Sequence, residues 1–303
     1  MTKPLKVEFT LLHSPSCFGI IDSSNFSKNS NMLLSICIPT FNRLSYLKEL
    51  LPAVLSQVDG IDGGDVEVLV SNNCSTDGTA AYLESLSSPS LRFWTNETNI
   101  GGDRNFLKCI CEAKGEYVWL VGDDDLIDQD GIVKVRGVLL SESPDLVIAD
   151  EFDVGEKSYP DYRSCLIGER NRKHLLALTH TLISANIFKR SVFDVEFAES
   201  RLWTSYAHMF GFIGNVTGKV MLLPSVIHTR EVRAEFEKYP SFLCIKHAIY
   251  FWCLASRFRL PSYRWYALKS ACNLPLEFGS RIKFYLKKMC RRNTEMKGGK
   301  RCS

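Results

Sequence analysis

The chain has 303 residues, of which 45% are hydrophobic and 23% are charged, and this composition is typical of a folded globular protein. Its net charge of +3 is small and no basic stripe is interleaved with aromatic residues, so the sequence does not indicate a nucleic-acid-binding protein. The length allows one large α/β domain with a helical extension, or two small domains.

Residues 1–31 end in a cluster rich in Ser and Asn, which predicts a disordered leader. From Met32 onwards, short apolar runs alternate with helical patterns. Strands are predicted at 33–38, where Pro39 ends the first run, and at 66–70, 91–95, 117–121 and 145–149. Helices are predicted at 46–55, from Asp77 onwards, at 103–113 and at 130–140. This alternation predicts an α/β fold with a mostly parallel sheet that is covered by helices on both faces.

After Asp150 the pattern loosens. Apolar runs at 181–188 and 219–223 predict additional strands, and from Glu231 the chain is helical in character and rich in aromatic residues. From Arg281 to the end, nine basic residues face one acid among apolar side chains. This composition is typical of a basic amphipathic helix on an anionic membrane surface, although a solvated tail has the same charge pattern.

The cysteines and the apolar runs indicate a soluble or peripheral protein of the cytoplasm. Eleven cysteines are scattered along the chain without a C-x-x-C pair, and the single C-x-C, Cys109 and Cys111, lacks the second ligand pair of a zinc site. The cysteines are therefore better interpreted as free thiols in a reducing compartment. No signal peptide is recognised at the start, and the uncharged apolar-leaning run 175–188 has 14 residues, fewer than the ~20 of a membrane span.

Polar clusters follow four consecutive predicted strands. They are Pro39-Thr40-Phe41-Asn42-Arg43, the run from 71 to 79, the run from 99 to 105, and Asp123-Asp124-Asp125. In an open α/β sheet, ligands bind outside the carboxyl ends of the strands. Turn composition accounts for any one of these clusters, but hardly for four in succession. We therefore expect a ligand site at this edge of the sheet.

The three consecutive aspartates are the most specific of these features. Neighbouring carboxylates repel one another unless a cation neutralises them, or unless they lie in a turn open to water. Carboxylate oxygens suit Mg²⁺ or Mn²⁺ that is shared with phosphates. The pair Gly101-Gly102 before a helix suits either a tight turn or a phosphate, but it belongs to no dinucleotide fingerprint or P-loop.

In this order and spacing, the four clusters resemble glycosyltransferase family 2. Its members carry P-T-[YF]-N-R, S-D-N-x-S-x-D-G-T, N-x-G-x-x-x-N and then an Asp-rich motif after an apolar strand. The resemblance covers residues 32–150. A further likeness, in residues 99–106 and in Thr204-Ser205-Tyr206-Ala207-His208, is to abequosyltransferase-like members that build bacterial O-antigen.

This resemblance implies a GT-A fold with a mostly parallel, Rossmann-like sheet and a helical C-terminal region. The catalytic domain would span 32–230, with a nucleotide-sugar half at 32–150 and an acceptor half at 151–230, followed by a helical region with a basic tail at 231–303. The implied reaction transfers a sugar from a nucleoside-diphosphate sugar to a saccharide hydroxyl, with inversion and with Mn²⁺ or Mg²⁺. Enzymes of this kind commonly act on lipid-linked acceptors, so peripheral contact with the cytoplasmic face of the inner membrane is expected.

The family motifs carry the implied site residues onto this chain. The implied donor-binding residues are Pro39, Thr40, Asn42, Arg43, Asn72, Asn73, Asp77, Asn99, Gly101, Asp103, Arg104, Asn105 and Asp123. The implied metal ligands are Asp124 and Asp125. His208 takes the approximate place of the family's catalytic base, with a pKa expected near 6.5, and Asp194 and Glu196 are the reserve candidates. A core histidine is the alternative for His208.

Two positions depart from the family pattern. Asn72 stands where the family usually has Asp, and since an amide both donates and accepts, the choice between uracil and cytosine stays open. Gly122 stands where the first carboxylate of the metal motif is expected. Two alternatives follow: a degenerate member that binds without catalysis, and a nucleotidyltransferase, although the segment after the first strand lacks the glycines that the latter needs. His228 and Arg230 are expected near the diphosphate or metal.

Overall fold

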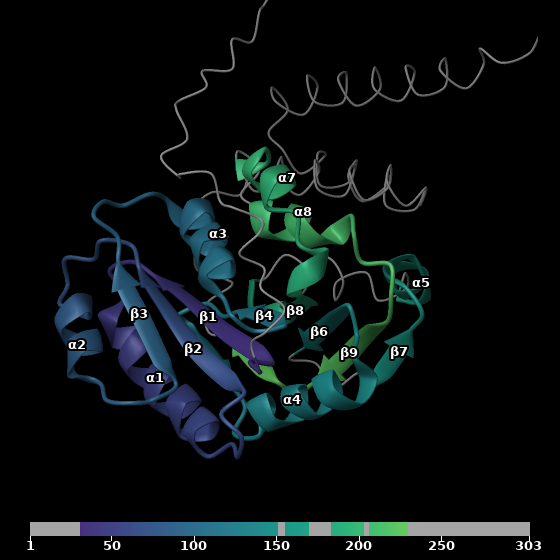
Figure 1. The fold of residues 1–303 in the computed structure, drawn as a ribbon, viewed down its shortest axis with the longest axis horizontal. Coiled ribbons are helices and arrows are strands. Elements are labelled where there is room, and N and C mark those ends of the chain that lie inside the picture. Colours follow the sequence, from purple (N-terminus) through teal and green to yellow (C-terminus); the bar gives the residue numbers. More distant parts are fainter. Residues whose placement is uncertain (1–30, 151–154, 170–182, 203–205, 230–303) are drawn as a thin grey trace, which may run out of the picture. The chain divides into compact units, whose positions relative to one another are not determined.

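The computed structural model describes residues 31–150, 155–169, 183–202 and 206–229. Within these ranges the chain forms an eight-stranded sheet with helices packed on both faces, and a separate pair of short strands (Figure 1). The predicted leader, the helical C-terminal region with its basic tail, and Thr204, Ser205 and Arg230 lie outside the described residues.

The sheet is mostly parallel, as the sequence predicts. Its strands are β1 (Leu34–Thr40), β2 (Val66–Asn72), β3 (Leu91–Thr95), β4 (Tyr117–Leu120), β6 (Leu146–Asp150), β7 (Lys157–Tyr159), β8 (Asn186–Lys189) and β9 (Val220–Pro224). They lie in the order β3-β2-β1-β4-β8-β6-β9-β7, and β8 and β7 run antiparallel to their neighbours. The separate pair joins β5 (Asp125–Ile127) to β10 (Ile227–Thr229) in antiparallel fashion.

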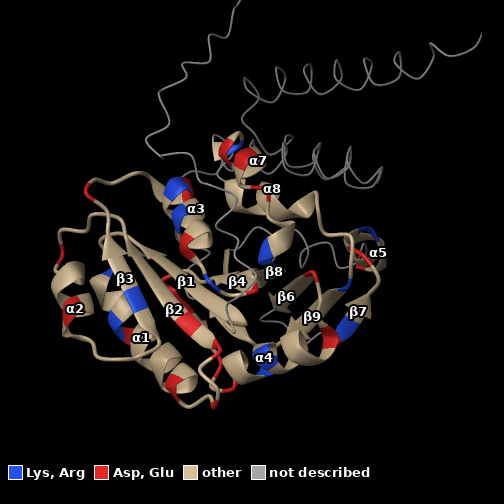
Figure 2. Cartoon of the chain, viewed as in Figure 1, with Lys and Arg blue, Asp and Glu red and all other residues tan. Residues whose placement is uncertain are grey.

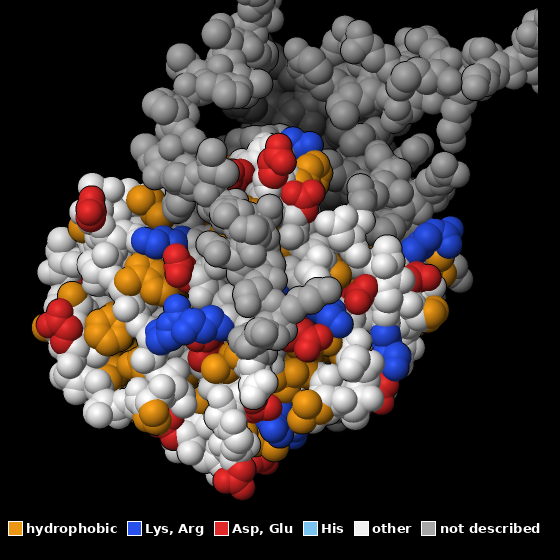
Figure 3. All heavy atoms as spheres, in the orientation of Figure 1, with side chains coloured by type: hydrophobic (Ala, Val, Ile, Leu, Met, Phe, Trp, Pro, Cys, Tyr) orange, Lys and Arg blue, Asp and Glu red, His pale blue; other side chains and the backbone are white. Residues whose placement is uncertain are grey.

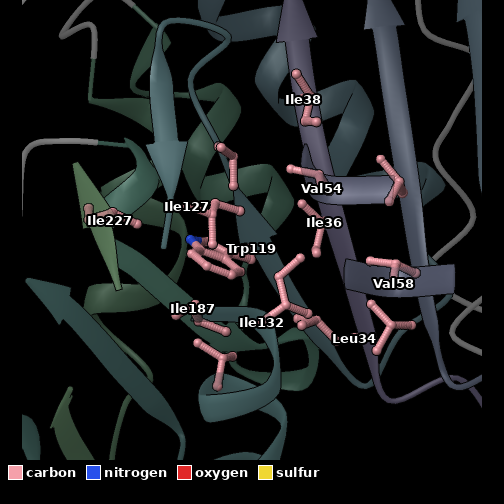
Figure 4. Packing of buried hydrophobic residues seen from close by; sticks show 14 of the residues in the cluster. Leu34, Ile36, Ile38, Val54, Val58, Trp119, Ile127, Ile132, Ile187 and Ile227 are labelled. Atoms are coloured by element: carbon pink, nitrogen blue, oxygen red, sulfur yellow. The ribbon is translucent and has the colours of Figure 1, made fainter. Parts of the chain in front are cut away.

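The helices cover the sheet because side chains alternate along each strand. They are α1 (Leu44–Asp59), α2 (Thr79–Ser85), α3 (Gly102–Glu112), α4 (Gly131–Glu142), α5 (Tyr162–Gly168), α7 (Val195–Glu199) and α8 (Ala207–Ile213), with short 3₁₀ helices η2 (Ile183–Ala185) and η3 (Arg190–Val192). From β1, Leu34, Ile36 and Ile38 pack with α1 and α4 (Figure 4). Cys37, on the opposite face, belongs to the core that includes α3 and α8.

Several boundaries differ from the prediction. In the apolar run 181–188, residues 183–185 form the 3₁₀ helix η2, and the strand β8 begins only at Asn186. Two further differences lie near the polar clusters. Pro39 does not end the first strand but lies inside β1, because its nitrogen faces the side of β4, where the pairing has already ended at Cys37 and Leu120. The second helix begins at Thr79 instead of Asp77, after Gly78 at φ 91°. Asp77 accepts a hydrogen bond from the Thr79 hydroxyl at 2.6 Å, so it braces the turn before the helix.

A buried carboxylate joins three segments near the amino end of the sheet. Glu67 of β2 is 3% exposed and accepts hydrogen bonds from Ser35 Oγ at 2.6 Å, Arg92 Nη1 at 2.7 Å and the Lys114 N–H at 2.8 Å. Figure 2 shows the charge bands on β2 and β3, the strands that hold Glu67 and Arg92, whereas other visible charges lie mostly on helices and loops. A buried charge with three donors is stable only while its partners remain.

The described surface has mixed character. On the face seen in Figure 3, acidic, basic and hydrophobic side chains are interspersed. Among the described helices, none has both the length and the apolar character that crossing a bilayer requires.

Candidate functional site

A row of polar residues crosses the carboxyl ends of three neighbouring strands. Thr40 of β1 pairs in register with Asn72 of β2, and Asn72 pairs with Thr95 of β3. On the other side of β1, Thr40 Oγ1 donates to Asp123 Oδ2 at 2.7 Å, which brings in the loop after β4. The row therefore runs from Asp123 through Thr40 and Asn72 to Thr95, at the edge of the sheet where α/β proteins bind ligands.

Arg43 provides the positive charge beside the aspartates. Its Nη1 lies 2.5 Å from Asp124 Oδ2 and 3.3 Å from Asp123 Oδ1, and its side chain is 33% exposed. Burial raises the pKa of Asp123 to about 6, although the Thr40 hydroxyl and Arg43 favour the charged form. Thr40, Arg43, Asp123 and Asp124 thus form one contiguous group, as their positions at the strand ends predict.

Asp125 has a different environment from Asp124. It is 9% exposed and accepts a short hydrogen bond from Ser184 Oγ, which in turn accepts from the Gly122 N–H at 2.8 Å. A Cβ atom at Gly122 would lie 2.9 Å from Asp125 Oδ2 and 3.0 Å from Asp124 Oδ1. The absent side chain at position 122 therefore leaves room for both carboxylates, and Asp125 supports the loop through η2. Its role as a metal ligand stays a prediction.

The donor set fits a metal ion that is shared with phosphates. Among the described residues, no group of three or more His, Cys, Asp or Glu side chains is placed to hold a metal ion by itself. Mg²⁺ is usually held by one or two carboxylates together with substrate phosphates, so a closed protein cage is not needed. Asp124, which is partly exposed, and Asp123 beside it provide such a pair.

The segment between β1 and α1 is short and fixed to the loop after β2. Asn42, at φ 54°, accepts a hydrogen bond from the Thr76 N–H at 2.8 Å and donates through its backbone to Ser75 Oγ at 2.9 Å. Asp77 Oδ2 accepts from the Leu44 N–H at 2.9 Å. Asn42 and Asp77, both implied donor-binding residues, therefore hold two neighbouring loops together. Pro39, behind them, is buried in β1.

The asparagines of the third motif form a buried network with β2. Asn105 Oδ1 accepts from Ser71 Oγ at 2.6 Å and from Asn96 Nδ2 at 3.0 Å, while its Nδ2 donates to the Ser71 carbonyl at 3.0 Å. Asn73 accepts from Asn96 Nδ2 at 3.1 Å and donates to Asn99 Oδ1 at 2.8 Å. These amides join the end of β2 to α3. Asn73, Asn99 and Asn105 therefore hold the segments around the site in place.

The beginning of α3 faces outward beside this network. Gly101, at φ 86°, precedes the helix, and its N–H donates to Asn99 Oδ1 at 2.9 Å. Asp103 lies in the first turn, and Arg104 is exposed and pairs with no acid among the described residues. Arg104 is therefore free to bind an anion, whereas Asn99 and Gly101 shape the turn before the helix.

Asn72 does not present a free amide. It is 0% exposed, its Nδ2 donates to Thr95 Oγ1 at 3.1 Å, and its Oδ1 accepts from the Ser75 N–H at 3.1 Å. Direct recognition of a nucleobase by this side chain is therefore disfavoured, because the side chain is fully buried and each polar atom already has one partner.

His208 lies on α8 and is 3% exposed. Neither ring nitrogen has a hydrogen-bond partner in the described part of the chain, and the ring packs edge-on against Phe106 of α3 with centroids 5.7 Å apart. Burial lowers its pKa to about 3, so the expectation of an ordinary pKa near 6.5 is wrong. This environment favours the core-histidine alternative, and a catalytic role for His208 stays a prediction.

This burial gives a pH-dependent stability that can be measured. The unfolded chain takes up a proton at His208 below about pH 6.5, whereas the folded chain does not until about pH 3, so stability is lost as the pH falls. Between about pH 7.5 and 5.5, we expect the wild type to lose about 1.4 kcal/mol more than His208→Gln in urea unfolding. Asp123, with its raised pKa, acts in the opposite direction but cancels between the two proteins. If the free energy of unfolding of wild type and His208→Gln changed equally with pH, His208 would not be a histidine that burial keeps neutral.

Two further candidates, Asp194 as a base and His228 near the diphosphate or metal, have structural partners. Asp194 is exposed, and its Oδ1 caps α7 by accepting from the Phe197 N–H at 2.8 Å. His228 of β10 contacts Asp128 through Nε2 in a short hydrogen bond. Because β10 pairs with β5, His228 lies near the strand that follows the aspartates, but its ring is paired with Asp128 and not with Asp124.

Sequence reasoning missed Ser184 and Thr95. Ser184 lies inside the apolar run 181–188 and gives no signal of its contact with Gly122 and Asp125. Thr95 is the last residue of a predicted strand, and this position at a carboxyl end was the available signal.

Comparison with known proteins identifies related chains. Residues 35–200 match the sequence profile of Glycosyl transferase family 2. The chain is 32% identical to abequosyltransferase RfbV of Salmonella typhimurium over 203 residues, 59% of this chain and 60% of that protein. It is 31% identical over 98 residues to the putative colanic acid biosynthesis glycosyl transferase WcaA of Escherichia coli, 32% of this chain and 34% of the other. The chain thus spans less than two thirds of either relative.

Solved structures share the fold at low sequence identity. Mannosyltransferase PcManGT from Pyrobaculum calidifontis, in complex with GDP-Man and Mn²⁺, has a TM-score of 0.54 at 14% identity, covering 83% of this chain and 78% of that one. Staphylococcus aureus TarS 1–349 in complex with UDP-GlcNAc has a TM-score of 0.52 at 18% identity, covering 81% and 68%. Since the family profile extends from β1 to the end of α7, over more than half of the chain, the protein belongs to glycosyltransferase family 2 and has the GT-A fold.

Proposed function

We propose that the chain transfers a sugar from a nucleoside-diphosphate donor to an acceptor hydroxyl, with inversion at the anomeric carbon. The observation that carries this proposal is the contiguous group of Thr40, Arg43, Asp123 and Asp124 at the carboxyl ends of β1 and β4. Membership of the family supports the reaction class. The short segment Phe41–Arg43 has no glycine, which disfavours a nucleotidyltransferase.

Each residue of this group has a distinct role in the proposal. Asp124, with Asp123, would hold Mn²⁺ or Mg²⁺, which when bound supplies positive charge to the leaving diphosphate. Arg43 is partly exposed, and its guanidinium would bind phosphate oxygens beside the aspartates, while Arg104 adds a second cation at the start of α3. Thr40 orients Asp123 through its hydroxyl. For the acceptor proton, Asp194 offers an exposed carboxylate, whereas His208 is neutral and buried.

The substrate assignment rests on the relatives. Abequosyltransferase RfbV and the colanic acid enzyme WcaA support a hexose or deoxyhexose donor and a saccharide acceptor in a bacterial surface polysaccharide of the O-antigen type. The test is a panel of UDP-, GDP-, CDP- and dTDP-sugars with Mn²⁺, in which release of the nucleoside diphosphate is measured. We expect the nucleoside diphosphate to be released from sugars that carry one particular base. A chelator that removes Mn²⁺ should abolish this release. A non-catalytic member would bind but release nothing, and a nucleotidyltransferase would require a sugar phosphate and a nucleoside triphosphate.

We also propose that the chain contacts the cytoplasmic face of the membrane through its basic end. The nine basic residues from Arg281 onwards support this, since each cation near an anionic surface contributes about 1 kcal/mol. We expect the protein to pellet with anionic vesicles at low salt and to be released as the salt concentration rises. Truncation after Ser280 should abolish pelleting but not donor hydrolysis. Full-length protein that ignores anionic vesicles at low salt would contradict the proposal.

A further inference from the structure

The two aspartates beside Arg43 are the central residues of a tight turn. Asp123 and Asp124 lie between Gly122 and Asp125, and the Asp125 N–H donates to the Gly122 carbonyl at 3.1 Å. Both central carboxylates contact the Arg43 guanidinium. Their directions therefore depend on how the two ends of the turn are held.

One buried hydroxyl holds both ends of this turn. Ser184 Oγ accepts a hydrogen bond from the Gly122 N–H at 2.8 Å and donates its single proton to Asp125 Oδ2 in a short hydrogen bond. The Ser184 side chain is 0% exposed, so it has no access to a substrate. Any effect of this hydroxyl on a bound ligand must therefore act through the turn.

Ser184 is in turn fixed to the strand that leads into the turn. Its carbonyl accepts from Trp119 Nε1 of β4 at 2.8 Å. Three residues later, Ile187 of β8 pairs in register with Trp119, and both side chains lie in the core (Figure 4). The hydroxyl is thus held in a set position relative to β4, which makes it a rigid support for the residues that follow this strand.

Asp125 is directed towards this support. It is 9% exposed, whereas the side chain of Asp124 is 29% exposed. Asp125 also begins β5, where it pairs with Thr229 of β10. Coordination of a metal ion through Asp125 Oδ2 would compete with the hydrogen bond from Ser184. The burial and the bonding of Asp125 therefore favour a supporting role.

We propose that Ser184, through the Gly122 N–H and Asp125, is a positioning residue that holds Asp124 in the geometry for binding Mn²⁺ or Mg²⁺ with a diphosphate. The inference rests on the proposed function, and it assigns to Asp125 the support of the turn in place of metal coordination. Residues that orient metal ligands typically contribute about 10–100-fold to metal affinity. Loss of the Ser184 hydroxyl should therefore weaken metal binding although no ligand is removed.

The test is calorimetric titration of Mn²⁺ into wild type, Ser184→Ala, Asp125→Asn and Asp124→Asn, each saturated with whichever of UDP, GDP, CDP and dTDP the wild type binds. We expect Ser184→Ala to bind Mn²⁺ about tenfold more weakly. Asp125→Asn keeps an oxygen that accepts the Ser184 proton, so its affinity should stay within about fivefold of the wild type. Asp124→Asn should lose about a hundredfold or more. At saturating Mn²⁺, donor hydrolysis should recover in Ser184→Ala but not in Asp124→Asn.

Ser35→Ala is the matched control, because Ser35 has the same bonding pattern near the amino end of the sheet. Its Oγ accepts from the Gly115 N–H at 2.8 Å and donates to Glu67 Oε1 at 2.6 Å, and its side chain is also 0% exposed. Both serine variants lose a buried hydroxyl, so both should have a lower melting temperature than the wild type. Only Ser184→Ala should bind Mn²⁺ more weakly, since a purely structural role would leave the two variants alike.

Two results would overturn the inference. One is a Mn²⁺ affinity of Ser184→Ala equal to that of Ser35→Ala, and the other is a loss in Asp125→Asn as large as in Asp124→Asn, which would make Asp125 a ligand. If Ser184→Ala does not fold, Asp125→Ala takes its place. This variant lacks the acceptor of the Ser184 proton and should bind Mn²⁺ about tenfold more weakly than Asp125→Asn, whereas equal affinities would contradict the inference.

The same titrations separate this inference from the proposed function. If the wild type binds none of the four nucleoside diphosphates with Mn²⁺, the proposed function fails and the inference fails with it. If the wild type binds one of them with Mn²⁺ and Ser184→Ala binds both equally well, only the inference fails.

Discussion

Replacement of Asp124 by Asn is expected to lower the rate of sugar transfer about a thousandfold while the domain stays folded. Such a loss corresponds to about 4 kcal/mol of transition-state stabilisation, because the neutral amide is a poor ligand for the divalent ion at the leaving diphosphate. Folding should be retained, since one of three neighbouring like charges is removed and Arg43 keeps its contact with Asp123. Measured transfer rates and thermal unfolding curves of wild type and Asp124→Asn give the loss of rate and the change in stability.

The matched control for this variant is Asp130→Asn. Asp130 is an exposed aspartate before α4 whose side chain makes no capping hydrogen bond, so its replacement should change neither rate nor stability. Direct titration with Mn²⁺ in the presence of the nucleoside diphosphate should show weaker metal binding for Asp124→Asn alone. An Asp124→Asn protein that keeps more than half of its metal-dependent rate would contradict the assignment.

Replacement of Glu67 by Ala is expected to lower the stability of the domain substantially. It removes the acceptor of Ser35 Oγ, the Lys114 N–H and Arg92, and the buried Ser35 hydroxyl loses the only acceptor to which it donates among the described residues. At ~1–3 kcal/mol for this buried donor and ~1 kcal/mol for each of the other two hydrogen bonds, we expect the free energy of unfolding to fall by about 3 kcal/mol. For a domain of this size, the melting temperature should fall by roughly 6–12 °C.

Thermal unfolding followed by circular dichroism measures this loss, and Glu84→Ala is the control. Glu84 is an exposed glutamate on α2, and its replacement should shift the melting temperature by no more than a degree or two. If Glu67→Ala melts with the wild type, the three hydrogen bonds contribute nothing to stability. Because Glu67 lies near the amino end of β2, donor binding by the protein that remains folded should be unchanged.

Much of the fold of residues 32–150 could be predicted from local sequence. The run Leu91–Thr95 coincides with β3, and the buried parallel strands read as apolar runs because both of their faces are covered. The elements that were missed are short. The strands β5, β7 and β10 and the 3₁₀ helices η2 and η3 have three residues each, α7 has five and α5 has seven. Such elements contain less than two periods of any pattern, and tertiary contacts decide their conformation.

The site could be predicted in outline for the same reason. Thr40, Arg43 and Asp123 converge because the carboxyl ends of parallel strands share one edge, and this follows from sequence position alone. The partners of individual side chains do not follow from it. The amide of Asn72 is engaged by Thr95 of the neighbouring strand, and the ring of His208 is buried against Phe106 of α3. Both contacts depend on packing between segments that are distant in the chain.

The space at Gly122 changes how the metal motif of this chain should be compared with that of its relatives. By letters alone, the chain has lost a carboxylate at position 122, which suggests an impaired enzyme. In three dimensions, the Asp125 and Asp124 oxygens lie within 2.9 Å and 3.0 Å of where a side chain at that position would begin. A larger side chain at position 122 would compete with Asp124 and Asp125 for the same space, so the glycine is compatible with an acidic loop and is not by itself a sign of lost function.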